Sequence, residues 1–506
     1  MSAILPVEVQ PEDEFNQKLI ENVHPPHWDN PKPSGRYNLV VIGAGTAGLV
    51  SAAGGAMLGA RVALVERHLM GGDCLNYGCV PSKALIRAAR ATYAISEAQE
   101  FGIHALEPKV NFSEVMKRLR RVRADISPHD SAERFRGFGA DIYLGEARFV
   151  GRNTIEVEGE RLEFKKAIIA SGARAAVPSI PGLKETGFLT NETVFSLTEL
   201  PRRLIVVGGG PIGCELAQSF SRLGSKVSII SDSVALLPKE DRDAAAILVR
   251  HFEREHIAMI LGAKIQRVER GAGDKRVVFE LGNGTEQVSG DEILVAVGRT
   301  PNLEGLGLES AGVHYDAKGV KVDDNLRTSN RDIFAAGDVA SRYQFTHAAE
   351  ALGRIALQNA LFFGRKRASD LIIPWCTFTD PEIAHVGLNE RDALKLGNDV
   401  ETFTLPYEEN DRAVVDGELN GFARIHTNKK DGRILGATLV SSHAGESIGE
   451  LVMAIQRNLK IGELSAVIHP YPTQAEIIKR LGDLSMRSRL KPWIKKALVK
   501  IFKWRR

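Results

Sequence analysis

Two cysteines, Cys74 and Cys79, lie five positions apart in the run GGDCLNYGCVPSKAL at residues 71–85. Only four cysteines occur in 506 residues, so half of the chain's sulfur is placed in this run. Two thiols at this spacing could form a structural disulfide, half of a metal site or a redox pair. A zinc site needs two more ligands, and Cys214 and Cys376 lie in unrelated segments. So few cysteines indicate a reducing compartment, where a close pair favours redox or metal chemistry.

A glycine-rich turn precedes the cysteine run, with Gly43, Gly45 and Gly48 between an apolar run and a segment of small residues. The first glycine permits a tight turn, the second lets the backbone approach a pyrophosphate, and the third lets a helix pack on a strand. The anion would rest on the N-terminus of that helix. Glu66 ends the next apolar run, where an acid binds ribose hydroxyls. The pattern predicts a dinucleotide site.

The same pattern returns in the run RLIVVGGGPIGCELAQSFSRLGSKVSII, with Gly208, Gly210 and Gly213. Ser231, followed by Asp232, stands where Glu66 stands in the first copy. A serine can hold a ribose hydroxyl, and no arginine follows at once to bind a 2′-phosphate. The sequence therefore predicts a second dinucleotide site and leaves the choice between NADH and NADPH open.

These elements predict an α/β chain with two Rossmann-like dinucleotide-binding domains and a C-terminal α+β dimerisation domain. Proline-rich residues 1–36 predict a mobile or surface-draped extension. The expected segments are the extension at 1–36, a first FAD-binding part at 37–185, an NAD(P)-binding domain at 186–298, a second FAD-binding part at 299–370, an interface domain at 371–485 and a basic tail at 486–506.

Bulk composition narrows the function class. The formal net charge of +3 gives no overall field that indicates nucleic acid. The N-terminus lacks a charged region followed by an apolar run, and no apolar segment of about 18 residues follows. We therefore expect a cytoplasmic protein.

The cysteine run, with Cys74, Cys79 and Lys83 in their order, resembles the active-site signature of the FAD-containing pyridine nucleotide–disulfide oxidoreductases. Dihydrolipoamide dehydrogenase, glutathione reductase and mercuric reductase belong to this family. The resemblance spans roughly residues 37–485 and includes SGA at 171–173, GRTPN at 298–302 and AAGDV at 335–339. It implies the class I fold, bound FAD, NADPH or NADH as donor, and a homodimer.

The resemblance also implies roles for residues near the cysteines. Cys79 would be the thiolate lying against the flavin, and Cys74 the outer thiol that exchanges with substrate. Lys83 would pair with Glu215 near the flavin, where a cation favours reduced flavin and lowers a thiol pKa.

Other positions would bind the cofactor. Asp338 would accept hydrogen bonds from the ribityl chain, and His347 would approach the flavin ring or serve as a structural histidine. Gly72, Gly172 and Gly298 are the motif glycines that would lie along FAD. Cys214 and Cys376 are expected in the protein core.

The C-terminal segment IHPYPTQAE departs from the lipoamide and glutathione enzymes. Their His-Pro-Thr-x-x-Glu motif supplies, from the partner subunit, a histidine that acts as acid–base. Here Tyr471 stands in place of that histidine ahead of Glu476, and His469 lies two residues upstream. Because a neutral tyrosine is a poor base at pH 7, ordinary disulfide substrates are disfavoured.

Mercuric reductases place a tyrosine at this position, and thiolates prefer soft metal ions. We therefore expect a mercuric reductase-like enzyme in which Cys74 and Cys79 bind Hg(II) transiently. Two features of those enzymes are missing: no cysteine follows Cys376, and none precedes Cys74 to form an N-terminal metal-binding domain. The ion would then arrive as an adduct of small thiols. The alternatives are a disulfide reductase, a quinone reductase, and a flavin-bearing scaffold protein at a membrane.

The chain closes with LKPWIKKALVKIFKWRR, which is apolar on one half of a helical wheel and basic on the other. Seven basic residues and no acidic one occur at 491–506. A helix packed on its own protein is the plain alternative, and binding to a partner protein is another. Two tryptophans and a wholly basic polar face favour peripheral contact with an anionic membrane.

Overall fold

The computed structural model describes residues 7–106, 108–362, 364–490 and 492–506. It divides into two compact units. The first contains the chain up to Val234 together with His256–Leu371, and the second contains Ala235–Glu255 together with Ile372–Arg506. Both units mix helices and sheets, which confirms the predicted α/β class.

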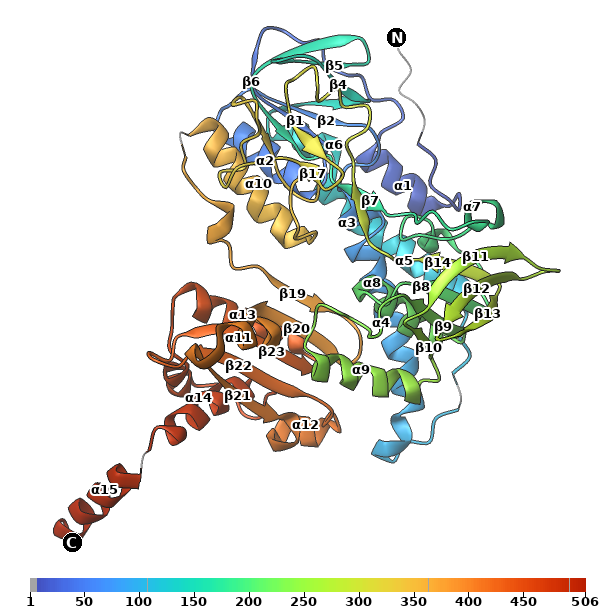
Figure 1. The fold of residues 1–506 in the computed structure, drawn as a ribbon. Coiled ribbons are helices and arrows are strands. Elements are labelled where there is room, and N and C mark those ends of the chain that lie inside the picture. Colours follow the sequence, from blue (N-terminus) through green and yellow to red (C-terminus); the bar gives the residue numbers. More distant parts are fainter. Residues whose placement is uncertain (1–6, 107, 363, 491) are drawn as a thin grey trace. The chain divides into compact units, whose positions relative to one another are not determined.

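The first unit is built around a large sheet (Figure 1). The first glycine-rich turn directly follows its strand β1. Its parallel strands read as continuous apolar runs because hydrophobic clusters cover both faces of the sheet. Helices α2 and α10 pack together against this sheet. The strands and helices are β1 (Tyr37–Ile42), β2 (Val62–Glu66), β3 (Ala140–Leu144), β4 (Ala147–Gly151), β5 (Thr154–Val157), β6 (Glu160–Ile169), β18 (Ile333–Ala335), α2 (Thr46–Met57), α6 (Ala132–Gly137) and α10 (Thr346–Leu361).

A second parallel sheet, in the order β10-β9-β8-β14, repeats the strand–turn–helix plan. The turn between β8 and α8 carries the second glycine pattern, so both predicted βαβ openings are confirmed. A three-stranded antiparallel meander follows. The elements are β8 (Arg203–Val207), α8 (Pro211–Arg222), β9 (Lys226–Ser231), β10 (Ala258–Leu261), β14 (Glu292–Val295), β11 (Lys264–Arg270), β12 (Lys275–Leu281) and β13 (Gly284–Gly290).

The cysteine run forms two consecutive helices, α3 and α4, and α4 packs on both α5 and α8. Two short strand pairs complete the unit, β7 with β15 and β16 with β17. The bounds are α3 (Gly72–Asn76), α4 (Cys79–Ser96), α5 (Phe112–Ile126), α7 (Leu183–Thr186), β7 (Ala173–Ala175), β15 (Arg299–Pro301), β16 (Tyr315–Asp316) and β17 (Gly319–Val320).

The N-terminal extension packs onto the first unit from Val7 onward, which agrees with the surface-draped alternative and not with the mobile one. Residues 14–23 form helix α1 (Glu14–Val23), which Asp13 caps through its side chain. Leu19 and Val23 are fully buried in the same cluster as β1 and β2. The sequence did not decide between the two alternatives because these apolar side chains are few and pack on residues distant in the sequence. Residues 1–6 of the predicted extension lie outside the described residues.

The second unit contains a five-stranded antiparallel sheet in the order β19-β20-β23-β22-β21, with α13 and α14 packed on it. Helix α9 joins this unit because Arg424 pairs with Asp241 (3.1 Å) and with Asp243. Among the described residues, no helix is long and apolar enough to cross a membrane. The bounds are β19 (Pro374–Thr377), β20 (Glu382–Gly387), β21 (Val400–Pro406), β22 (Phe422–Asn428), β23 (Ile434–Ser441), α9 (Arg242–Arg254), α11 (Glu390–Leu396), α12 (Asp411–Asp416), α13 (Ala444–Gln456), α14 (Glu476–Ser488) and α15 (Pro492–Trp504).

Candidate functional site

The two cysteines lie on either side of the break between α3 and α4. Cys74 is in α3, and Cys79 is the first residue of α4. Both are free thiols, and each is the largest influence on the pKa of the other. The Thr346 hydroxyl at the start of α10 lies 3.2 Å from the Cys79 sulfur. The predicted pair is therefore assembled at close range.

The environment makes the two thiols unequal. The hydrogen bond from Cys74 is the main cause that lowers the pKa of Cys79 to about 6, and Thr346 and the charge of Lys83 act in the same direction. The same hydrogen bond and burial raise the pKa of Cys74. The free N–H groups at the start of α4 also favour a negative sulfur there. The pKa of Cys79 is therefore lowered and that of Cys74 raised, so Cys79 is the thiol of the pair that ionises first.

Lys83 lies one helical turn after Cys79, so both side chains are on the same face of α4. Its ammonium is 2.9 Å from Glu215 Oε2 on α8, and the Glu215 side chain is buried while Lys83 is partly exposed. The structure therefore forms the predicted Lys83–Glu215 pair.

The first glycine-rich turn has the shape that a dinucleotide requires. Gly43 has a φ of +98°, and a side chain there would overlap the carbonyl of Ala170. Gly45 is the N-cap of α2 and supplies no side-chain cap, so the first N–H groups of α2 are available to a phosphate. Gly72 packs on Gly45, because a Cβ on Gly72 would lie 2.7 Å from the Gly45 Cα. The cysteine run thus begins against the predicted diphosphate site.

Glu66 lies at the end of β2, and its carboxylate is already bound within the turn. Its oxygens accept hydrogen bonds from the backbone N–H of Ala44 (2.6 Å) and His68 (2.8 Å). Burial raises the pKa of this carboxyl group. Each oxygen keeps a second lone pair, so these contacts are compatible with the predicted ribose contact and also fix the turn.

A charged cluster that the sequence analysis missed connects the cysteine run to Asp338. Arg299 lies 3.0 Å from Asp73, the neighbour of Cys74, and 3.3 Å from Asp338. Asn191 donates a second hydrogen bond to Asp73 (3.0 Å). Burial raises the pKa of Asp338 to about 6, although Arg299 acts against this shift. The sequence signal for Arg299 was the GRTPN run, in which Arg299 directly follows Gly298.

The other residues predicted for the first cofactor also lie in the first unit. Gly172 follows β6, and Gly298 precedes β15; both have positive φ, and a Cβ at either would meet open space. His347 lies in the first turn of α10, where its ring stacks on Phe345 at 5.5 Å. This stacking agrees with the structural alternative for His347.

The second glycine pattern forms a similar turn. A side chain on Gly213 would overlap the Gly208 carbonyl, whereas around Gly210 the space is open. Gly210 is the N-cap of α8, again without a side-chain cap. Ser231 ends β9, and its hydroxyl accepts a hydrogen bond from the N–H of Ser233 (3.2 Å). The geometry fits a second dinucleotide diphosphate.

The residues predicted for acid–base chemistry lie in the second unit, where Tyr471 and Glu476 are connected through Asp411 and Arg480. The Tyr471 hydroxyl donates to Asp411 (3.0 Å), which raises the tyrosine pKa. His469 Nε2 lies 2.9 Å from Glu450 Oε2. Glu476 is 3.9 Å from Arg480. Asp411 and Glu450 are partners that spacing in the sequence did not reveal.

The two remaining cysteines are both at least partly buried. Cys214 is fully buried, which confirms its predicted core position, and burial raises its pKa. Cys376 is partly buried against the hydrophobic cluster of the second unit. No group of three or more His, Cys, Asp or Glu side chains in the described ranges is arranged to hold a metal ion.

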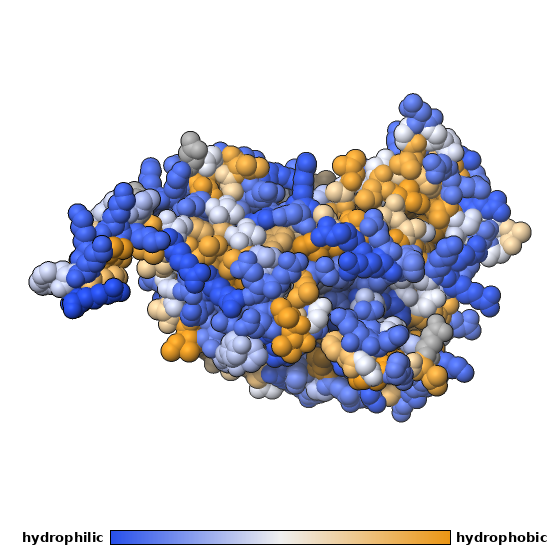
Figure 2. Space-filling model, turned by 90° about the horizontal axis from the view of Figure 1, so that it is seen from below, coloured by the Kyte–Doolittle hydropathy of each residue, from blue (hydrophilic) through white to orange (hydrophobic). Residues whose placement is uncertain are grey.

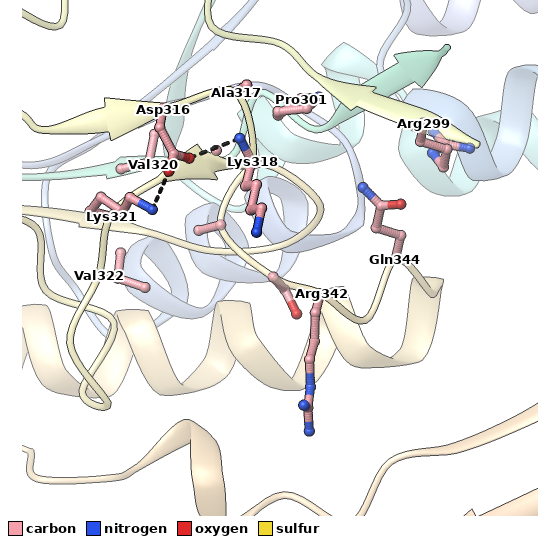
Figure 3. A pocket seen from close by; sticks show the side chains of 13 residues that line it. Arg299, Pro301, Asp316, Ala317, Lys318, Val320, Lys321, Val322, Arg342 and Gln344 are labelled. Carbon is pink, nitrogen blue, oxygen red and sulfur yellow. Dashed lines mark hydrogen bonds and ion pairs between the residues drawn. The ribbon is translucent and has the colours of Figure 1, made fainter. Parts of the chain in front are cut away.

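A pocket of about 510 Å³ lies beside the β16–β17 hairpin (Figure 3). Asp316 is bound by Lys321 (2.5 Å) and by the backbone N–H of Lys318. Arg342 and Gln344 line another part of the wall. Neither cysteine lines this pocket, so it does not replace the cysteine pair as the candidate centre.

Two family models match the chain. Residues 37–353 match "Pyridine nucleotide-disulphide oxidoreductase", and residues 373–481 match the dimerisation domain of the same class.

Curated relatives and solved structures agree with these matches. The chain is 34% identical to a mercuric reductase from Bacillus cereus over 88% of this chain and 70% of the relative. It is 35% identical to a dihydrolipoyl dehydrogenase from Thermus scotoductus over 87% of this chain and 95% of the relative. A Cu(II) complex of the HOCl-induced flavoprotein disulfide reductase RclA from Escherichia coli matches with a TM-score of 0.77 and 29% identity, covering 87% and 98% of the two chains. LpdA from Mycobacterium tuberculosis matches with a TM-score of 0.81 and 26% identity, covering 88% and 99%.

The electrostatics of the pair generate a first prediction. In the reduced, anaerobic protein, the 13C chemical shift of the Cys79 Cβ is expected to titrate with a midpoint near pH 6, with the thiolate above it. Lys83→Met removes a nearby positive charge and should raise the midpoint by about half to one unit. Arg87→Met removes a cation from the exposed side of the same helix and serves as control. A wild-type midpoint near the ordinary thiol value of about 8.5 would contradict this assignment.

Proposed function

Because the chain belongs to the pyridine nucleotide–disulphide oxidoreductase family, we propose that it is a mercuric reductase-like NAD(P)H oxidoreductase. Members of the family depend on FAD and use NAD(P)H as electron donor. The proposed substrate is Hg(II), or a related ion, delivered as an adduct of two small thiols. The proposed reaction converts NAD(P)H, a proton and the Hg(II) dithiolate into NAD(P)⁺, Hg(0) and two free thiols.

The residues around the first glycine turn would hold FAD, which when bound supplies electron transfer from NAD(P)H to the cysteine pair. The turn at Gly43 and Gly45 offers N–H groups to the diphosphate, and Glu66 and Asp338 offer carboxylates to hydroxyl groups. The chain's own contribution is the thiol pair. Cys79 is held as a thiolate, and Cys74 is the thiol that meets the incoming ion.

The observation that carries the choice of a metal ion is the hydrogen bond from Tyr471 to Asp411. Because this bond raises the tyrosine pKa, the hydroxyl stays protonated at pH 7 and cannot act as a base. Transfer of a soft ion between thiolates needs no base at this position, whereas exchange with a disulfide does. The mercuric reductase relatives support a soft metal ion as substrate, and a solved structure of a similar protein is a Cu(II) complex.

A disulfide reductase is the second candidate, and the His469–Glu450 pair is the observation that favours it. A histidine 2.9 Å from a carboxylate has the arrangement of an acid–base pair. The dihydrolipoyl dehydrogenase relatives support this alternative as well. A quinone reductase would use the same flavin site without the cysteines.

We also propose the assembly and domain plan. The C-terminal match is to a dimerisation domain, which supports a homodimer in which Tyr471 and Glu476 of one subunit act beside Cys74 of the other. The FAD-binding parts at 37–185 and 299–370 would enclose an NAD(P)-binding domain at 186–298. Ser231 leaves NADH and NADPH as equal candidates, because the hydroxyl carries no charge to attract or repel a 2′-phosphate.

Changing Cys74 to Ser gives the main test. The variant should keep FAD bound and reducible by NAD(P)H but lose reduction of Hg(II) by at least about 10³-fold, the scale on which removal of a nucleophile acts. Cys376→Ala alters a cysteine of the other unit and should retain activity. Full turnover by Cys74→Ser would show that the pair is not the electron relay.

The choice of acceptor is tested by assaying Hg(II) dithiolates, lipoamide, oxidised glutathione and quinones with the same preparation. Loss of turnover in His469→Gln, with disulfides as the best substrates, would favour the second candidate. Retention of quinone turnover in Cys74→Ser would favour the third.

We propose further that the enzyme works in the cytoplasm and binds anionic membrane peripherally through residues 491–506. Lys491 lies outside the described residues, and Pro492–Trp504 form the helix α15. The apolar side chains of α15 are exposed, with Trp493 at 66%, Phe502 at 57% and Trp504 at 85%. Basic and apolar side chains both show on this helix at the left of Figure 2. An exposed apolar stripe beside a wholly basic face suits the interface of an anionic bilayer.

This proposal predicts sedimentation of the enzyme with vesicles of anionic lipid at low salt and its release at high salt. Deletion after Leu490 should abolish binding. Because each basic residue contributes about 1 kcal/mol, Lys500→Gln with Lys503→Gln should weaken binding by about 30-fold. Vesicles of neutral lipid are the control. If neither the full-length nor the truncated protein binds anionic vesicles, the tail is not a membrane anchor.

A further inference from the structure

The N-terminal segment at residues 7–36 precedes the part of the chain that the family model matches, yet it contacts the residues that lead into the cysteine run. The carbonyl of Val23, the last residue of α1, accepts a hydrogen bond from the N–H of Met70 (3.0 Å). His24 contacts the carbonyl of His68. The Asn76 side chain, between the two cysteines, donates back to the Met70 carbonyl (3.1 Å). The end of α1 therefore fixes the residue from which the cysteine run starts.

A second line of contacts runs from the first turn of α1, through α5, to the centre of the cysteine run. Asn16 Oδ1 accepts a hydrogen bond from Arg123 Nη2 on α5. Arg123 Nη1 then donates to the Asn76 carbonyl (2.8 Å). All three residues are buried, and α1 lies alongside α5 (Figure 1). Arg120, also on α5, forms an ion pair with Asp13, the N-cap of α1.

These contacts hold the turn between the cysteines at two points. The Asn76 side chain is fixed by the carbonyls of Met70 and Gly72, and its own carbonyl is fixed by Arg123. Arg123 Nε is already buried without a hydrogen-bond partner, so the acceptors of the other two nitrogens matter more, because an orphaned N–H in the interior costs free energy. Loss of Asn16 would leave one Arg123 N–H without its acceptor and let the guanidinium turn away from Asn76.

We propose that residues 7–30 are a brace that positions the turn between Cys74 and Cys79, with Asn16 and Arg123 as positioning residues. The C-terminal end of the segment is itself anchored, because Trp28 donates to the Ile142 carbonyl (3.0 Å) and Asn30 is bonded to both backbone groups of Leu144. The brace keeps the Cys74 thiol aimed at the Cys79 sulfur. Its consequence for turnover rests on the proposed function, whereas its effect on the thiols does not.

The test compares two substitutions on α1 that each remove one contact with α5. Asn16→Ala breaks the contact that continues to Asn76. Lys18→Ala removes the exposed ion pair with Asp125 (2.8 Å). This pair is not part of the contacts that reach Asn76, so the substitution is the matched control. Asn16→Asp keeps an acceptor for Arg123 and should restore wild-type behaviour. All three are made in the full-length holoenzyme.

Two quantities are measured: the 13C titration midpoint of the Cys79 Cβ, and the equilibrium between the cysteine disulfide and a glutathione buffer. In Asn16→Ala the midpoint should rise by about half a unit, which destabilises the reduced form about threefold at pH 7. Lys18→Ala and Asn16→Asp should match the wild type in both quantities.

Two outcomes would overturn the brace. If Asn16→Ala leaves midpoint and equilibrium unchanged, α1 only adds stability. If Lys18→Ala shifts them as far as Asn16→Ala, the effect is general loosening of the helix pair. Neither outcome would affect the Hg(II) assays of Cys74→Ser, so failure of the brace is distinguishable from failure of the proposed function.

Discussion

The coupling between the Cys74 and Cys79 thiols is the interaction on which the rest of the site depends, because it lowers the pKa of Cys79 and raises that of Cys74. A thiolate at Cys79 needs a donor beside it, free N–H groups at the start of α4 and a cation one turn away. The donor comes from α3, and the N–H groups and the cation both come from α4. The dinucleotide turn supports the start of the run through Gly72, and α8 holds Lys83 through Glu215.

Much of this arrangement is readable from the sequence because it rests on local chemistry. Glycine spacing defines the turn before a helix, so both dinucleotide turns were predicted with their residues. The cysteine spacing and the Lys83–Glu215 pair followed from the resemblance to a family. The antiparallel C-terminal domain followed from a change in the pattern of apolar runs near Pro374.

The rest depends on contacts between residues far apart in the chain. The sequence of the N-terminal segment does not predict that Asn16 contacts Arg123. A single buried asparagine gives no periodic pattern, and its partner lies about a hundred positions away. Arg299 is the first residue of β15, and it joins Asp73 to Asp338 only when this strand is paired with β7. Tyr471 and His469 likewise find their partners on distant helices. Asp411 on α12 keeps the tyrosine protonated, and Glu450 on α13 places a carboxylate beside the histidine.

The central claim is that electrons from NAD(P)H come to rest on the cysteine pair, leaving Cys79 as a thiolate beside the flavin. Anaerobic titration of the holoenzyme with NADPH, and separately with NADH, tests this most directly. The account predicts that a long-wavelength absorbance, the mark of a thiolate next to oxidised flavin, grows with the first equivalent and is lost in Cys79→Ser. Bleaching of the wild-type flavin by the first equivalent, with no long-wavelength absorbance at any stage, would contradict it.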